Sequence, residues 1–313
     1  MSKTESRSSD PSSQSLAGGR GPIVWLDMDQ KALDDAYDQS CWAPNASHLQ
    51  KRRRLASERA IALLGEPRRV SYGPTEIEQL EIYRYNRPNA PIHVFIHGGA
   101  WRGGRARDSA YMAEMYLAAG AHLVIPDFVW VQDAGGSLLT MADQVRRAVA
   151  WVYQNASSFG GDPERLYISG HSSGGHLGGV LVTTDWKKEF GLPSNLIKGA
   201  LLVSGMYDLK PVRMSKRREY VNFDDLTEET LSAQRHIDKI NMPLIIGHGS
   251  LESPEFQRQS REFAQAVRAA GKTVEFFVGE GFNHFEMQET MGNPFGLGGR
   301  AALLLMGLTI AAR

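Results

Sequence analysis

The chain has 313 residues, 42% of them hydrophobic, so it is long enough to bury a large core. Its 35 basic and 35 acidic side chains balance, which argues against nucleic acid or a charged membrane surface as partner. No apolar run approaches the length of about 20 residues that a helix needs to span a membrane. The single cysteine, Cys41, excludes an internal disulfide and fits a reducing cytoplasm.

The amino-terminal part is polar. Residues 1–21 are rich in Ser and Gly and lack an apolar anchor, so they are expected to form a disordered tail. Residues 22–313 are expected to form one domain, in which Asp29 caps a short helix that runs to Ala36. A second helix is predicted over 48–64, and its basic run Lys51 to Arg54 is interpreted as a solvated helix face.

Two predicted strands, residues 69–72 and 78–85, form an antiparallel pair about a Gly-Pro turn. Leu80 and Ile82 alternate with polar neighbours such as Glu81, which is typical of a strand with one exposed face.

From residue 92 onward, apolar strands alternate with helices. Strands are expected over 92–96, 123–126, 166–169, 200–204, 244–247 and 274–278. This order predicts an α/β fold with a doubly wound, mostly parallel sheet and an antiparallel strand pair at its start. Ligands bind such sheets at the carboxyl ends of the strands. Residues 211–239 are more charged than a crossover needs and are expected to form a small cap-like insertion near the site.

The central motif is Gly170-His171-Ser172-Ser173-Gly174, the G-x-S-x-G pattern of a nucleophile elbow. A short apolar strand precedes it and a helix of small residues follows. Gly170 and Gly174 remove side chains that would clash around a strained turn. The pattern predicts Ser172 as a catalytic nucleophile, and the plainer interpretation is an ordinary strand–helix turn with an idle serine.

A serine nucleophile needs a base, and the base needs an orienting acid. After an elbow the acid and then the histidine follow along the chain, each just after a later strand. His284 follows the last strand and is the predicted base. Glu252 follows the strand at 244–247 and is the predicted acid, while Asp208, at the end of the preceding strand, stays open as the alternative.

The third requirement is an oxyanion hole. Gly98 and Gly99 end the first long buried strand, where their amides could face a substrate, and the Ser173 amide is the third predicted donor. Losing one such donor typically costs about 3–4 kcal/mol of transition-state stabilisation. No phosphate-binding loop, dinucleotide fingerprint or cluster of metal ligands stands out, so neither a cofactor nor a metal ion is expected.

With these motifs, the chain resembles the kynurenine formamidase (arylformamidase) branch of the α/β-hydrolases. The matching stretches include HGGAWRGG at 97–104, GHSSGGHLGG at 170–179, SGMYDLKP at 204–211, ESPEFQRQS at 252–260 and NHFEM at 283–287. The resemblance implies the same roles for Ser172, His284, Gly98 and Gly99. The branch usually has Asp at the position of Glu252, which keeps the alternative acid open.

The resemblance further implies a serine hydrolase that cleaves a small, formyl-like acyl group from an aromatic amide or ester, as in N-formylkynurenine hydrolysis. A general carboxylesterase for small esters is the alternative, and a non-catalytic binding protein is a third hypothesis. Trp101, Tyr207 and Trp42 are expected to bind the aromatic part. The expected partner is a small molecule, with no nucleic acid and no membrane, and a homodimer is left open.

Overall fold

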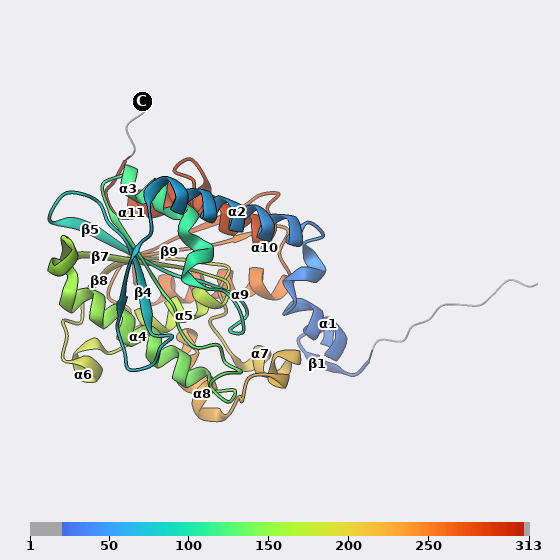
Figure 1. The fold of residues 1–313 in the computed structure, drawn as a ribbon. Helices are drawn as coiled ribbons and strands as arrows, with labels where there is room; N and C mark the ends of the chain where they lie inside the picture. Colours follow the sequence, from blue (N-terminus) through green and yellow to red (C-terminus); the bar gives the residue numbers. More distant parts are fainter. Residues whose placement is uncertain (1–20, 310–313) are drawn as a thin grey trace, which may run out of the picture.

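The computed structural model describes residues 21–309, which form a sheet covered by helices on both faces (Figure 1). Eight strands hydrogen-bond in the order β10-β9-β8-β7-β5-β6-β4-β3, and β1 pairs with β2 in a separate small sheet. The strands are β1 Ile23–Trp25, β2 Met28–Asp29, β3 Arg68–Ser71, β4 Gln79–Tyr83, β5 Ala90–Ile96, β6 His122–Pro126, β7 Gly161–His171, β8 Ile197–Val203, β9 Leu244–Gly249 and β10 Val274–Gly279. The tail predicted over residues 1–21 lies, apart from Gly21, outside the described residues.

The pairing directions confirm the predicted fold class. β3 and β4 are antiparallel to each other, and β4 is antiparallel to β6. All other neighbours in the large sheet run parallel. β5 and β7 lie side by side near the middle of the sheet, so the carboxyl ends of both strands meet at one edge.

One strand differs from its prediction. In β4 every residue from Leu80 to Tyr83 is buried, including Glu81, which is 3% exposed. The strand lies between β3 and β6, and its two faces contribute to two separate apolar clusters. The Tyr83 hydroxyl donates a hydrogen bond to Glu81 at 3.0 Å, and burial raises the pKa of that carboxyl. The predicted exposed face of this strand was therefore wrong.

The helices form two layers (Figure 1). Helices α4, α5 and α9 cover one face of the sheet, and α2, α3, α10 and α11 cover the other. The helices are α1 Gln30–Ala36, α2 Ala46–Leu64, α3 Ala113–Ala118, α4 Leu138–Asn155, α5 Ser173–Val182, α6 Trp186–Phe190, α7 Lys210–Met214, α8 Asp225–Leu231, α9 Pro254–Ala269, α10 His284–Thr290 and α11 Leu297–Leu305, with short 3-10 turns η1 Gln39–Trp42 and η4 Lys216–Glu219. The predicted cap at Asp29 is confirmed, because its carboxylate accepts a hydrogen bond from the Ala32 amide at 2.9 Å.

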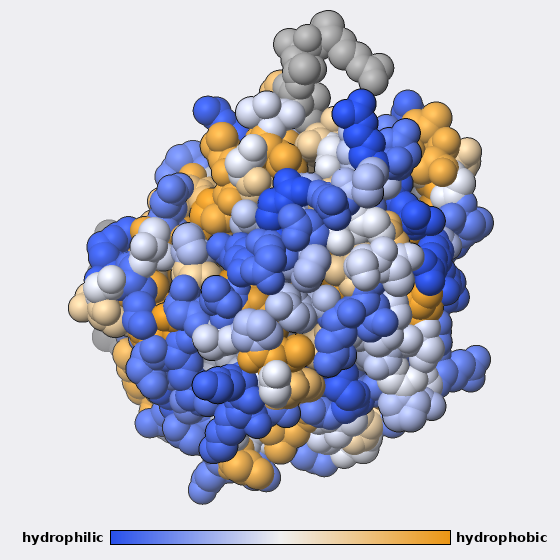
Figure 2. Space-filling model, turned by 90° about the vertical axis from the view of Figure 1, so that its left-hand side faces the viewer, coloured by the Kyte–Doolittle hydropathy of each residue, from blue (hydrophilic) through white to orange (hydrophobic). Residues whose placement is uncertain are grey.

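The surface is mixed in character. Figure 2 shows one face on which hydrophilic residues cover most of the area and hydrophobic residues lie in small separate groups. Among residues 21–309, no helix is long and apolar enough to cross a membrane.

Candidate active site

Ser172 lies at the sharp turn between β7 and α5. Its backbone has φ 59° and ψ −125°, a conformation that costs a non-glycine residue strain and is typical of active-site positions. The Ser172 amide donates a hydrogen bond to the Val203 carbonyl of the neighbouring strand at 3.0 Å, which holds the turn in place. The serine side chain therefore stands at the carboxyl edge of the sheet, in front of the amino-terminal end of α5.

The glycines of the motif permit this turn. A Cβ on Gly174 would lie 2.0 Å from the Ile96 carbonyl oxygen, and one on Gly170 would lie 2.1 Å from the Gly174 carbonyl oxygen. Both obstacles are backbone atoms, which cannot move aside as a flexible side chain could. The elbow packs against the end of β5 at a distance that only glycine allows.

The predicted base and acid contact each other. The His284 Nδ1 atom lies 2.7 Å from Oε2 of Glu252, and both side chains are buried. The other carboxylate oxygen of Glu252 accepts hydrogen bonds from the Ser204 hydroxyl at 2.6 Å and from the Gly249 amide at 2.7 Å. Because a carboxylate only accepts, this contact orients Nδ1 as the donor and leaves Nε2 as the acceptor that a base requires.

The alternative acid lies elsewhere. The Asp208 carboxylate accepts from the Lys210 amide at 3.1 Å and faces the Arg235 guanidinium at 3.4 Å. It is not among the residues that line the cavity around Ser172. The structure thus brings Glu252, and not Asp208, to the imidazole of His284.

The loop after β5 supplies free amides beside the serine. A Cβ on Gly98 would lie 3.1 Å from the Ser172 Cβ, so this backbone passes directly against Ser172. Gly99 has φ 131°, and no hydrogen bond in the described part of the chain uses the Gly98 or Gly99 amide. The loop is held to the elbow by the Trp101 amide, which donates to the Ser173 hydroxyl at 3.3 Å. These amides are free to bind a developing oxyanion.

The three aromatic residues expected to bind substrate do not line the cavity. Trp101 is buried and donates from Nε1 to His176 at 3.2 Å. Tyr207 is buried against the Phe263 ring, 4.3 Å away. Trp42 is 39% exposed, and its indole donates to the Asp35 carbonyl. The aromatic side chains that do line the cavity are Tyr37, Tyr220 and Phe285.

Two residues that the sequence analysis did not assign support the site. Ser204 has φ 54° and presents its hydroxyl to Glu252. The His171 Nε2 atom lies 2.9 Å from the His284 carbonyl oxygen, and the two rings lie 4.5 Å apart. Burial, reinforced by the nearby His284, holds the pKa of His171 well below its usual range, so this ring stays neutral beside the His284 ring. In the sequence, the position of His171 inside the G-x-S-x-G motif was the signal that could have placed it beside Ser172.

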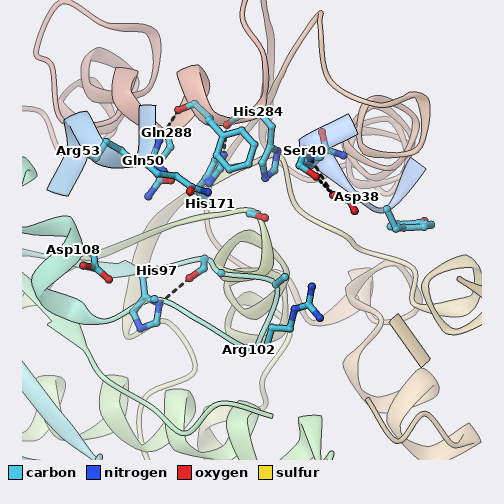
Figure 3. A pocket seen from close by; sticks show the side chains of 18 of the residues that line it. Asp38, Ser40, Gln50, Arg53, His97, Arg102, Asp108, His171, His284 and Gln288 are labelled. Atoms are coloured by element: carbon cyan, nitrogen blue, oxygen red, sulfur yellow. Dashed lines mark hydrogen bonds between the residues drawn. The ribbon is translucent and has the colours of Figure 1, made fainter. Parts of the chain in front are cut away.

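A cavity of about 690 Å³ joins these groups. Ser172, His284, Gly98 and Gly99 all line it. In Figure 3, His284, Arg53, Gln50 and Gln288 lie on one wall, and His97, Asp108 and Arg102 lie on the opposite wall. Within residues 21–309, no three His, Cys, Asp or Glu side chains come together as metal ligands do.

Comparison with known proteins identifies the family. The BD-FAE family model matches residues 80–267, more than half of the chain. Kynurenine formamidase of Danio rerio is 30% identical over 285 residues, which span 85% of this chain and 93% of that protein. Esterase LipC of Mycobacterium tuberculosis is 26% identical over 66% of this chain and 56% of its own length.

Solved structures share the fold. An esterase of Thermogutta terrifontis superposes with a TM-score of 0.62 and 21% identity, over 78% of this chain and 91% of that one. A thermostable carboxylesterase from a metagenomic library superposes with a TM-score of 0.64 and 17% identity. The chain is therefore a hydrolase that belongs to the kynurenine formamidase branch of the α/β-hydrolases, within the BD-FAE family.

Proposed function

We propose that this hydrolase removes a formyl or similarly small acyl group from an aromatic amide or ester through an acyl-enzyme on Ser172. The observation that carries the proposal is that His284 lines the same cavity as Ser172 while its Nδ1 lies 2.7 Å from the buried carboxylate of Glu252. The substrate class comes from the relatives, because the kynurenine formamidases of Danio rerio and Salmo salar are each 30% identical to this chain.

In the proposed reaction the Ser172 oxygen attacks the acyl carbon while its proton passes to Nε2 of His284. The carbonyl oxygen becomes an oxyanion, which the amides of Gly98, Gly99 and Ser173 stabilise. The bond to the leaving group then breaks as Nε2 returns the proton to the departing nitrogen or oxygen. Water attacks the acyl-enzyme by the same route and releases the acid. Glu252 holds the imidazole in the tautomer that can accept the serine proton.

The segment 211–239 supports a small substrate. Its residues Lys216, Arg217, Glu219 and Tyr220 line the cavity beside the serine. We infer that this segment is a cap that limits the length of the acyl group or of the leaving group.

The exposed thiol of Cys41 suits a reducing compartment, and the cytoplasm is the location that we propose.

A substrate panel tests the proposal. Rates on formanilides, acetanilides and longer anilides are compared with rates on the corresponding phenyl esters, for the wild type and for Ser172→Ala. We expect hydrolysis of the formyl compounds that disappears in the variant, with an unchanged melting temperature. Hydrolysis that persists in Ser172→Ala would reject the mechanism.

The alternative is a general carboxylesterase, which the similarity to Esterase LipC favours. Fast hydrolysis of phenyl acetate and longer esters, with no turnover of any formanilide, would select it. Labelling of Ser172 by a fluorophosphonate probe is expected under both functions and separates them from a non-catalytic binding protein.

A further inference from the structure

Both proposed partners of Ser172 lie at the start of a helix. Glu252 immediately precedes Ser253, the N-cap residue of α9, and His284 immediately follows Asn283, the N-cap residue of α10. The side chains of Ser253 and Asn283 accept hydrogen bonds from backbone amides of the helices that they cap. Because an N-cap fixes the direction in which the chain enters a helix, these two residues control where the carboxylate and the imidazole lie.

Both N-cap side chains also bond to one amino-terminal segment, residues 36–45. The Gln39 Nε2 atom donates to the Ser253 hydroxyl oxygen at 2.8 Å, and the Asn283 Nδ2 atom donates to Oδ1 of Asn45 at 2.7 Å. Gln39, Ser253 and Asn283 are all buried. The two contacts join residues 214 and 238 positions apart in the sequence. One short segment therefore holds the loops in front of both α9 and α10.

Asn45 closes a ring of hydrogen bonds at the start of α10. Its Nδ2 atom donates to Oε1 of Glu286 at 3.0 Å, and the Asn283 backbone amide donates to Oε2 of the same carboxylate at 2.9 Å. Asn45 is itself the N-cap residue of α2, yet its side chain makes no cap hydrogen bond to α2 in the described part of the chain. An asparagine at this position usually caps the helix that it begins. Here its side chain instead supports the helix that begins with His284.

We propose that Asn45 and Gln39 are positioning residues, which hold His284 and Glu252 at the separation that their hydrogen bond needs. The inference rests on the proposed function, because it concerns the same imidazole and carboxylate. Asn45 is not among the residues that line the cavity around Ser172, so it acts through the imidazole and not on the substrate.

The first test is Asn45→Ala, with kcat measured on an activated phenyl ester. We expect kcat to fall about ten- to a hundredfold, as for a catalytic group displaced by about 1 Å, while KM changes little. The variant should fold, because the Tyr37 hydroxyl still anchors the segment to the buried Glu255 carboxylate at 2.7 Å. Asn155→Ala is the matched control and should keep the wild-type kcat, because Asn155 is also half-buried but bonds to the Trp151 carbonyl within α4.

A swap of donor and acceptor separates a lost hydrogen bond from a general disturbance. Asn45→Asp sets two carboxylates against each other, and Glu286→Gln turns an NH₂ group toward one donor of the ring, so each single variant should be slow. In the double variant Asn45→Asp/Glu286→Gln, the new amide donates to the new carboxylate while its oxygen still accepts from the Asn283 backbone amide. The ring is complete again, and most of the lost kcat should return. Losses that multiply in the double variant would overturn the proposal.

Gln39→Ala should also lower kcat, and a double-mutant cycle shows whether either effect passes through the acid. In the Glu252→Gln background, where His284 no longer faces a carboxylate, Gln39→Ala and Asn45→Ala should each have little further effect, because residues that act as a unit are not additive. Full additional losses in that background would mean that both residues act on the fold in general, and would reject the positioning role.

The outcomes separate this inference from the proposed function. Hydrolysis that is abolished by Ser172→Ala but unchanged in Asn45→Ala and Gln39→Ala would overturn the inference and leave the proposed function standing. The hydrogen bond from the Leu251 amide to the Phe282 carbonyl, at 3.0 Å, would then be enough to hold the two loops together.

If hydrolysis persists in Ser172→Ala, the proposed function fails, and proton NMR decides the inference. A downfield resonance of the Nδ1 proton of His284, assigned by its absence in Glu252→Gln, reports the contact between the two side chains directly. This resonance should shift or disappear in Asn45→Ala and stay in Asn155→Ala. An unchanged resonance in Asn45→Ala would reject the positioning role.

Discussion

Replacing Glu252 by Gln would test the proposed triad with little change in shape. The carboxylate accepts three hydrogen bonds, with one oxygen facing His284 and the other facing Ser204 and Gly249. An amide has only one acceptor oxygen. If that oxygen keeps the two donors from Ser204 and Gly249, the amide NH₂ faces Nδ1 of His284. Nδ1 must then accept, and the proton moves to Nε2.

A histidine protonated on Nε2 cannot take the serine proton. We therefore expect kcat to fall about 10⁴-fold, as when the acid of a triad is replaced by its amide. The melting temperature should change little, because the amide oxygen keeps the hydrogen bonds from Ser204 and Gly249 and the amide NH₂ donates a third one to Nδ1. Hydrolysis of an activated phenyl ester measures kcat, and thermal unfolding checks the fold.

Asp208→Asn is the matched control. Asp208 pairs with Arg235 and not with the imidazole, so its amide variant should keep kcat within about threefold of the wild type. Glu252 is not the acid of the triad if Glu252→Gln keeps more than a tenth of the activity, or if Asp208→Asn suffers the larger loss.

Three further predictions concern packing, substrate and pH. Gly174→Ala should destabilise the fold by about 3 kcal/mol in urea unfolding, because its Cβ would meet the Ile96 carbonyl at 2.0 Å, whereas Gly103→Ala, with its nearest atom at 3.6 Å, should be mild. Trp42→Ala should alter kcat/KM for a formanilide less than Tyr220→Ala, because only Tyr220 lines the cavity. Burial lowers the pKa of His93 to about 3 and that of His176 to about 4. As the pH falls below 6.5, the ordinary pKa of histidine, these rings take up protons in the unfolded chain but not in the folded one. Each ring therefore lowers the free energy of unfolding by about 1.4 kcal/mol per pH unit until the pH reaches its pKa in the folded state. Urea unfolding between pH 7 and 5 should therefore show a shallower loss of stability in His93→Gln.

The sequence was informative where backbone geometry decides the outcome. Gly170 and Gly174 mark a turn in which backbone atoms approach within about 2 Å of any added Cβ, so the local pattern is itself the constraint. Ser172, His284 and Gly98 follow from that turn and from chain order, and the structure places all three on one cavity.

The sequence was less informative where the direction of a side chain decides the outcome. Trp101 follows Gly98 and Gly99 in the loop after β5, yet its backbone has a positive φ of 63° and its indole lies buried against His176. Tyr207 lies inside the matching stretch 204–211, yet its ring packs on Phe263. The position of an aromatic residue next to a motif does not determine the direction of its ring. That direction is set by the helices against which the ring packs.

More basic than acidic side chains line the cavity, although the net charge of the whole chain is zero, and the basic run in α2 shows how this arises. Lys51 is exposed, as a solvated face requires, and Arg52 pairs with Glu289. Arg53 instead donates to the Phe285 carbonyl at 3.0 Å, and Gln50, Arg53 and Arg54 line the cavity. Residues at spacing i, i+3 and i+4 share one face of a helix, so a single run of charges serves two surfaces. The cations that line the cavity come from distant parts of the chain, namely α2, the loop at 102–105 and η4. The net charge of the whole sequence therefore does not reveal the positive charge of the cavity.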